Sequence, residues 1–356
     1  MPGRSLGSLL VLAALLALVP TVTFAKGFQE KEVLFFSRDV RLAGTIAQPD
    51  GPGPFPGVVL VPESGPVDRD ESWGKGNGTF RELAHHLADN GFAVLRYDPR
   101  GVPKSGGDFL GAGLYNFAQD AANALNYLKT LKGIDRQKVF AIGHGYGAKA
   151  AIIAGLKTPD ITGVVLLAGI YDKEPEHRER IMRFQLETDG KSQGEIDKVL
   201  AQHREYVQKI AFGRYFQYED YFLDPTMADW LVQAMQLNPQ PPVWWRDNML
   251  FEPTQAAARL PCGLLMVHGE NDYLVETQRV TAAQRTIKKL GKEDVELKVF
   301  PGLNHRFVPA VSRQQAYKFE CATVLTKSDT SYPIELAVLA HIHGWLKGRL
   351  EKGKGK

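Results

Sequence analysis

The sequence predicts an α/β fold, in which a mostly parallel, doubly wound sheet carries an inserted helical segment. Residues 58–61 (VVLV) form a short, continuously apolar run, which is typical of a strand buried on both faces. Such runs alternate with stretches of helical spacing, and this alternation indicates a parallel sheet covered by helices. The alternation stops between residues 171 and 258, where the chain is charged, rich in aromatic side chains and without a convincing strand. We therefore expect residues 171–258 to form a helical cap inserted into the sheet domain.

The expected elements follow one another in a regular order. Two short strands, at residues 33–36 and 42–47, are expected to pair as a hairpin. Further strands are expected at residues 58–61, 92–97, 139–142, 164–167, 264–267 and 295–300. Helices are expected at residues 80–89, 117–132, 148–156, 276–290 and 333–346. The first of these helices ends at the turn-forming pair Asn90 and Gly91.

The N-terminal residues have the pattern of a secretory signal peptide. Arg4 precedes an apolar run over residues 9–19, and Thr23 and Ala25 place small residues where cleavage needs them. The apolar run is shorter than the ~20 residues of a membrane span. We therefore expect cleavage after Ala25 and a secreted or periplasmic protein without a stable membrane span; an uncleaved anchor is the alternative. The expected domains are a signal peptide at 1–25, a discontinuous sheet domain at 26–170 and 259–350, the cap at 171–258 and a basic tail at 351–356.

Composition narrows the expected partners and cofactors. The 356 residues carry a formal net charge of +3 without a basic stripe, so we expect no nucleic-acid partner. The sequence has no phosphate-binding or dinucleotide-binding glycine loop, so we expect no cofactor. The adjacent His85 and His86 have no matching ligands, so we expect no metal site. Cys262 and Cys321 either form a disulfide in an oxidising compartment or remain separate buried thiols.

One glycine-rich stretch raises the question of catalysis. Residues 141–148 (AIGHGYGA) join an apolar strand to a helix-like run, as in the G-x-S-x-G turn that exposes a nucleophilic serine. The position of that serine is taken by Gly145, which has no side chain. Two polar loops follow later strands, and they carry Asp272 and His305. Because parallel strands place their sites at their carboxyl ends, we expect these three positions to meet, in the chain order of an α/β-hydrolase triad.

Further motifs strengthen the comparison with a known family. A segment SGPVDRD stands at residues 64–70, DPRGVPKS at residues 98–105, and a run from Trp245 to Pro253 closes the expected cap. Together these segments resemble the α/β-hydrolases, in the esterase branch related to dienelactone hydrolases and acyl-peptide-cleaving enzymes. The resemblance covers nearly the whole mature chain. It implies the α/β-hydrolase fold with a helical cap, and a small-molecule ester or related ligand.

The resemblance also implies the roles of the site residues. A serine at position 145 would attack the ester carbonyl, His305 would accept its proton, and Asp272 would orient the histidine. The oxyanion would be held by the backbone N–H of Tyr146 and by the loop around Glu63 and Ser64. Two structural alternatives stay open, in which His305 is a loop residue without a partner and Asp272 caps the following helix.

The remaining motif residues have expected structural roles. Arg69 pairs with carboxylates that hold its loop, and Asp68 and Asp70 flank it. Arg100 anchors a turn in the same way. His144 is expected to be a packing residue that points away from the pocket.

Two departures from the family weaken the case for esterase activity. Gly145 removes the oxygen that nucleophilic catalysis needs. The family carries a glycine before the SGP segment, whereas this chain has Glu63, whose charge would oppose an oxyanion. Three hypotheses therefore remain. The chain is a pseudoenzyme that binds a ligand or partner; a hydrolase or lyase that uses His305 and Asp272 with Glu63, Ser64 or activated water; or an esterase whose serine was replaced.

Overall fold

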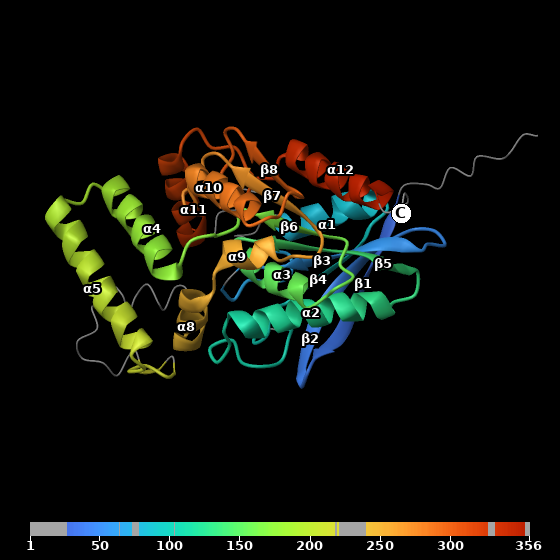
Figure 1. The fold of residues 1–356 in the computed structure, drawn as a ribbon, viewed down its shortest axis with the longest axis horizontal. Helices are drawn as coiled ribbons and strands as arrows, with labels where there is room; N and C mark the ends of the chain where they lie inside the picture. The colour runs from blue at the N-terminus through green and yellow to red at the C-terminus, as the bar shows by residue number, and fades with distance from the viewer. Residues whose placement is uncertain are drawn as a thin grey trace, which may run out of the picture.

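The computed structural model describes residues 27–63, 65–72, 78–102, 104–217, 219–220, 240–326 and 332–352. The expected signal peptide lies outside these residues, as does Ser64. Within them, an eight-stranded sheet has helices on both faces (Figure 1). The predicted doubly wound α/β architecture is therefore confirmed.

The sheet is mostly parallel. Its strand order is β1-β2-β4-β3-β5-β6-β7-β8, with antiparallel pairing only at β1–β2 and β2–β4. The strand bounds are β1 Phe28–Ser37, β2 Val40–Pro49, β3 Phe55–Val61, β4 Ala93–Tyr97, β5 Ile134–His144, β6 Gly163–Leu167, β7 Gly263–Gly269 and β8 Val295–Phe300. The hairpin expected at the start of the chain is present as β1 and β2, and each strand is longer than its apolar core predicts. The central strands are continuously apolar because helices cover both of their faces.

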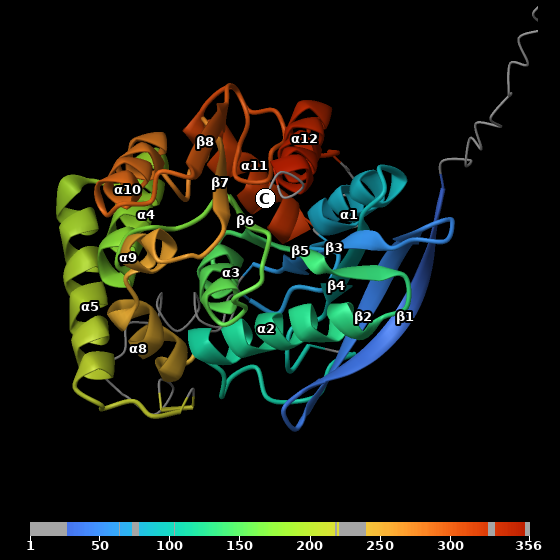
Figure 2. The same ribbon diagram turned by 45° about the vertical axis from the view of Figure 1, so that its right-hand side comes forward.

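The helices form two layers. The sheet domain contains α1 Thr79–Asp89, α2 Leu114–Thr130, α3 Gly147–Leu156, α10 Thr277–Lys289, α11 Arg313–Thr326 and α12 Leu336–Lys352. Helices α2, α3 and α10 pack on one face, and α1 and α12 lie side by side on the other (Figures 1 and 2). Each layer closes its own apolar core against the sheet.

Helix α1 illustrates why these segments fold as they do. Phe80, Leu83 and Leu87 recur at helical spacing and are fully buried, so one face of the helix packs on the sheet. The helix ends at Asn90, and Gly91 has a φ of 90°, a left-handed conformation that glycine adopts without strain.

The described elements between β6 and β7 are helices. They are α4 Glu174–Thr188, α5 Gln193–Ala211, α8 Pro242–Leu250 and α9 Pro253–Ala258. Helices α4 and α5 lie beyond the sheet (Figure 2), whereas α9 packs against α3 and α10 of the sheet domain. No helix in the described ranges is long and apolar enough to cross a membrane.

Two details of the C-terminal region differ from the prediction. Helix α11 is absent from the predicted elements, because its sequence has no clear apolar periodicity. Helix α12 continues to Lys352, so Glu351 and Lys352 belong to the helix and not to the expected tail. In the sheet domain Cys262 is a buried free thiol, and the side chain of Cys321 lies outside the described part of the chain.

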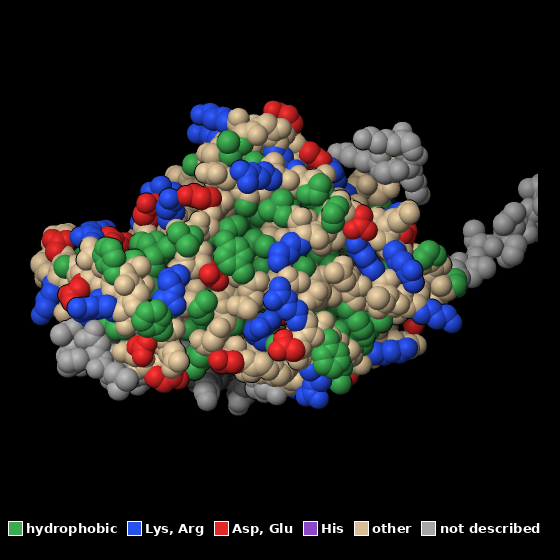
Figure 3. Space-filling model, turned by 60° about the horizontal axis from the view of Figure 1, so that its bottom comes forward, with side chains coloured by type: hydrophobic (Ala, Val, Ile, Leu, Met, Phe, Trp, Pro, Cys, Tyr) green, Lys and Arg blue, Asp and Glu red, His purple; other side chains and the backbone are tan. Residues whose placement is uncertain are grey.

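Acidic and basic side chains are interspersed on the face drawn in Figure 3, with apolar side chains between them. This mixture agrees with the small formal net charge of +3. The face presents no extended stripe of a single charge.

Candidate active site

Four loops at the carboxyl ends of the parallel strands build the site. Glu63 follows β3, Gly145 follows β5 directly, Asp272 follows β7 and His305 follows β8. The adjacent strands β3 and β5 bring Glu63 beside Gly145, and the loops after β7 and β8 place Asp272 against His305. The fold thus brings together the three positions that the sequence links, and adds the side chain of Glu63.

The glycines around position 145 are required by close backbone contacts. A Cβ atom at Gly143 would lie 2.3 Å from the carbonyl oxygen of Gly147, and one at Gly147 would lie 2.3 Å from that of Pro62. Gly145 itself has a φ of 52°, the left-handed conformation of a sharp strand-to-helix turn. The backbone therefore has the shape of a nucleophile turn although Gly145 has no side chain.

The carboxylate of Glu63 occupies the space of the missing side chain. A Cβ atom at Gly145 would lie 1.6 Å from Glu63 Oε2 and 2.3 Å from its Cδ. Atoms that are not bonded to each other cannot approach so closely. A side chain at position 145 and this position of Glu63 therefore exclude each other.

Glu63 also makes the hydrogen bonds that a nucleophile and its oxyanion would make. The N–H of Tyr146 donates to Glu63 Oε1 over 2.8 Å, and His305 Nε2 lies 3.0 Å from Glu63 Oε2. His305 Nδ1 lies 2.8 Å from Asp272 Oδ2. The result is a continuous chain from Glu63 through His305 to Asp272, with side chains that are 13%, 3% and 0% exposed.

The hydrogen-bonded series formed by Glu63, His305 and Asp272 is ionised. Burial opposes charge on Glu63, but the hydrogen bond and the positive charge of His305 outweigh it and lower the pKa of Glu63 to about 2. Burial likewise opposes the imidazolium, but Asp272 and Glu63 outweigh it and raise the pKa of His305 well above its usual value. Burial also disfavours the charged form of Asp272, yet His305 keeps its pKa lowered. At neutral pH His305 is therefore a proton donor between two carboxylates, whereas a serine hydrolase needs a neutral histidine.

Asp272 serves two purposes. Its Oδ1 accepts hydrogen bonds from the N–H groups of Leu274 and Val275, at 2.8 and 3.0 Å, while its Oδ2 faces His305. Asp272 thus orients the histidine and holds the turn at residues 274–275. It does not cap the following helix, because the N-cap of α10 is Glu276.

A second pair of buried residues links the same loops. The N–H of Glu63 donates to Glu71 Oε1 over 2.8 Å, and Glu71 Oε2 lies 2.8 Å from His144 Nδ1. His144 Nε2 in turn faces the carbonyl oxygen of His305 at 3.1 Å. This bridge corrects two expectations. The N–H of Glu63 is engaged by Glu71 and does not point at an oxyanion, and His144 connects two site loops as well as packing against them.

The bridge could not be read from sequence spacing. Glu71 lies directly after the SGPVDRD segment, and no motif rule assigns it a partner. It has a φ of 50°, which is uncommon for a residue with a side chain, and it is 1% exposed. The only sequence signal for His144 was its position beside Gly145.

The other motif residues hold the loops outside the site. Arg69 donates to both carboxylate oxygens of Asp98, and Arg96 donates to Asp70 over 2.5 Å. Asp68 Oδ1 accepts two backbone N–H groups of its own turn. Arg100 pairs with the buried Asp120 on α2. These contacts tie the loop after β3 to β4 and to the loop that follows it, and tie that second loop to α2.

The side chain of Tyr146 joins the site to the inserted helices. Its hydroxyl donates to Glu174 Oε1 over 2.6 Å, and Lys149 Nζ lies 3.6 Å from Glu174 Oε2. Burial lowers the pKa of Lys149 although Glu174 opposes this effect. Trp244 packs edge-on against the Tyr146 ring. The residue that supplies the N–H to Glu63 is therefore held by α4 and α8.

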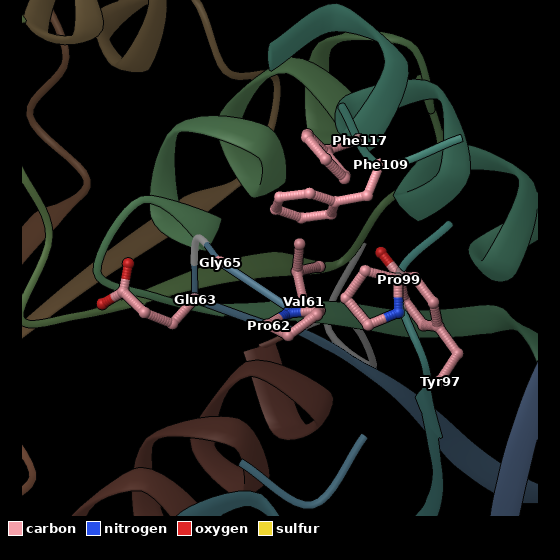
Figure 4. A pocket seen from close by; sticks show the side chains of 8 residues that line it. All are labelled: Val61, Pro62, Glu63, Gly65, Tyr97, Pro99, Phe109 and Phe117. Atoms are coloured by element: carbon pink, nitrogen blue, oxygen red, sulfur yellow. The ribbon is translucent and has the colours of Figure 1, made fainter. Parts of the chain in front are cut away.

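An apolar cavity of about 30 Å³ lies beside the β3 loop. It is lined by the residues shown in Figure 4, namely Val61, Pro62, Glu63, Gly65, Tyr97, Pro99, Phe109 and Phe117. The carboxylate of Glu63 points away from the phenylalanine rings in this view. The ionised oxygens of Glu63 are thus turned away from the aromatic rings that line the cavity.

Glu63, His144 and His305 also offer three ligand-type atoms within 4.8 Å of one another, although no metal site was expected from the sequence. Both nitrogens of each histidine already face an oxygen atom. A carbonyl oxygen only accepts hydrogen bonds, so His144 Nε2 carries a proton and has no lone pair for a metal. These residues fit the ionised hydrogen-bond network better than a metal centre.

Comparisons with known proteins identify the family. Residues 74–309 match the family described as serine aminopeptidase, S33. The chain belongs to this family of α/β-hydrolases. It is also 27% identical over 293 residues to Esterase EstD of Thermotoga maritima, which covers 82% of this chain and 63% of that protein. The chain thus spans less than two thirds of the length of this relative.

Solved structures show the same fold at low sequence identity. An esterase of Pyrococcus furiosus is 17% identical with a TM-score of 0.51, over 84% of this chain and 89% of its own. Est1E of Butyrivibrio proteoclasticus, solved with ferulic acid, is 15% identical with a TM-score of 0.53, over 83% and 97% of the two chains. These structures confirm the expected α/β-hydrolase fold. The family match and the similarity to Esterase EstD support the expected esterase branch.

Proposed function

We propose that this member of the family does not hydrolyse esters through a serine, and that its site works through Glu63, His305 and Asp272. One observation carries the proposal. The carboxylate of Glu63 stands where the side chain of residue 145 would be, and it is bonded to both the histidine and the N–H of Tyr146. The carboxylate of Glu63 thus stands in place of the serine hydroxyl that the family uses. The histidine and its orienting carboxylate are retained.

The same observation argues against the simple loss of a serine. A serine at position 145 would collide with Glu63 unless the carboxylate left both of its hydrogen-bond partners. A single Gly145→Ser substitution is therefore expected to leave the chain inactive on short p-nitrophenyl esters. The double variant Glu63→Gly with Gly145→Ser removes the collision and is expected to gain ester hydrolysis.

Fluorophosphonate labelling tests the proposal directly, because these probes react with activated serines. We expect no labelling of the unmodified chain and none of Gly145→Ser, but labelling of the double variant at position 145. Adding Ser64→Ala to the double variant is the matched control and should not reduce the labelling. Labelling of the unmodified chain would show an activated serine and would overturn the proposal.

A second function, ligand binding without turnover, is favoured by the charge state of the site. Glu63 and His305 already neutralise each other, and Glu63 meets the same partners that a bound carboxylate product would meet. For this function, Glu63→Ala should open the site to small carboxylates such as acetate or butyrate. A rise of the melting temperature with butyrate in Glu63→Ala, together with no turnover by the unmodified chain on any ester or epoxide, supports binding over catalysis.

We also propose that the protein is exported after cleavage at Ala25, and is secreted or periplasmic. The support is the charged residue Arg4 followed by the apolar run at residues 9–19 and the small residues before the cleavage position. The N-terminal sequence of the exported protein should begin at Lys26. An intact N-terminus in the membrane fraction would favour the uncleaved anchor.

A further inference from the structure

We propose that Glu63 is a covalent nucleophile, and that its substrate class is a small epoxide. This inference rests on the proposed function, because it assigns the reacting atom of the same site. It starts from the different surroundings of the two carboxylate oxygens. Oε1 accepts from the N–H of Tyr146, and Oε2 lies both at the vacant position of residue 145 and 3.0 Å from His305.

The position of Oε2 is the position of attack. In this fold the side chain of residue 145 delivers the attacking atom to the substrate, next to the histidine. Glu63 Oε2 stands 1.6 Å from where that side chain would begin. The side chain of Glu63 is 13% exposed. Carboxylates are established nucleophiles that form covalent intermediates.

The chemistry of Glu63 favours a saturated carbon over an ester carbonyl. A carboxylate with a pKa of about 2 is a better leaving group than any alkoxide, so its adduct with an ester would collapse back to the starting ester. In addition, the N–H that would hold the carbonyl oxygen of an ester is occupied by Oε1. Attack on an epoxide carbon releases ring strain, and protonation of the alkoxide that forms prevents the ring from closing again.

The first half-reaction balances within the site. The Oε2 electron pair forms a bond to the epoxide carbon, the ring C–O bond breaks, and the ring oxygen leaves as an alkoxide. Formation of the ester removes the negative charge of Glu63, which is one of the causes that keep His305 protonated. His305 can then release its proton, through water, to the alkoxide. The products of this step are a hydroxyalkyl ester on Glu63 and a neutral His305.

The second half-reaction uses the same groups in reverse. Neutral His305, still oriented by Asp272, takes a proton from water, and the hydroxide adds to Cδ of Glu63. The oxyanion that forms on Oε1 faces the N–H of Tyr146, which already points at that atom. The intermediate collapses, the diol leaves with the proton of His305, and the proton of the new carboxyl group returns to His305. Epoxide and water are thus converted into a diol.

The test is the mass of the tryptic peptide that contains Glu63, after incubation of the full chain with 1,2-epoxyhexane. In the His305→Gln variant the ester should form but not hydrolyse, so the peptide should gain the mass of one epoxide. Glu63→Gln should show no such gain. Glu71, on the same loop but 1% exposed, is the internal control and should stay unmodified. Where His305→Gln does not fold, Asp272→Asn replaces it.

A second measurement needs no variant. In a single turnover of the unmodified chain in water enriched in ¹⁸O, the heavy oxygen should enter Glu63 and raise its peptide mass by about 2 Da, because water attacks the carboxyl carbon. Absence of both the adduct and the isotope would overturn the assignment of Glu63 as nucleophile, as would equal labelling of Glu71. Fluorophosphonate labelling of the unmodified chain is a separate outcome, which would overturn the proposed function itself.

Discussion

The mutual exclusion of Glu63 and a side chain at position 145 leads to a quantitative prediction. In Gly145→Ala, the new methyl group must displace the carboxylate from Tyr146 and His305. Hydrogen bonds to charged groups contribute about 1.5–3 kcal/mol each, and a left-handed φ costs a non-glycine residue about 1–2 kcal/mol. We therefore expect Gly145→Ala to lower the free energy of unfolding by roughly 4 kcal/mol or more. In a Glu63→Ala background only the backbone contribution of about 1–2 kcal/mol remains.

Urea unfolding of the four proteins in this double-mutant cycle measures the coupling. Gly190→Ala is a matched control, because Gly190 also has a left-handed φ, of 76°, but has nothing within 4 Å of the added Cβ. It should cost about 1–2 kcal/mol in either background. A cost of Gly145→Ala no greater than that of Gly190→Ala, or the same cost with and without Glu63, would refute the mutual exclusion of Glu63 and a side chain at 145.

Three further predictions concern charge and burial. The lowered pKa of Glu63, about 2, stabilises the fold above the unfolded value near ~4.3, and this contribution is lost as the pH falls toward 2. The raised pKa of His305 stabilises the fold below about 6.5, and that contribution is lost as the pH rises through the folded value. Urea unfolding as a function of pH should therefore show the greatest stability between about pH 4.3 and 6.5. Glu63→Gln should reduce the loss of stability at both lower and higher pH. An unchanged pH profile in this variant would contradict the ion pair. Glu71→Gln weakens the contact with His144 and should lower the free energy of unfolding by about 1–3 kcal/mol, as measured by urea unfolding. An unchanged urea midpoint would contradict this expectation. Burial raises the pKa of the Cys262 thiol to about 11, so iodoacetamide should label it slowly in the folded chain and quickly in urea, as read by peptide mass; rapid labelling of the folded chain would contradict its burial.

The central part of the fold was predictable because its strands are buried on both faces. An apolar run such as that in β6 admits few other interpretations when glycine-rich turns and amphipathic helices flank it. Helix α11 was not predictable, since its side chains lack an apolar period. The length of β1 and β2 was underestimated because their outer ends carry charged residues whose pairing is set by the hairpin register.

The parts of the site that depend only on the course of the backbone were predictable from the sequence. Gly145, Asp272 and His305 each follow a strand, and the topology alone brings those strand ends together. The side chain of Glu63 was not predictable, because its direction depends on tertiary partners. The sequence suggested that its charge would oppose an oxyanion, whereas the structure has that charge accepting the very N–H that an oxyanion would use. The partnership of Glu71 with His144 joins residues that are far apart in the chain, and no spacing rule reveals it.

The overlap at position 145 also constrains how such a chain could have evolved. A side chain at 145 and the present position of the Glu63 carboxylate exclude each other, so the carboxylate can settle against the turn only where residue 145 has no side chain. With Glu63 in place, a serine at 145 would have to displace the carboxylate from Tyr146 and His305, which costs stability. The residue at position 145 and the position of the Glu63 carboxylate are therefore coupled. A serine at position 145 would therefore require a second change, in which the carboxylate of Glu63 is removed or leaves Tyr146 and His305.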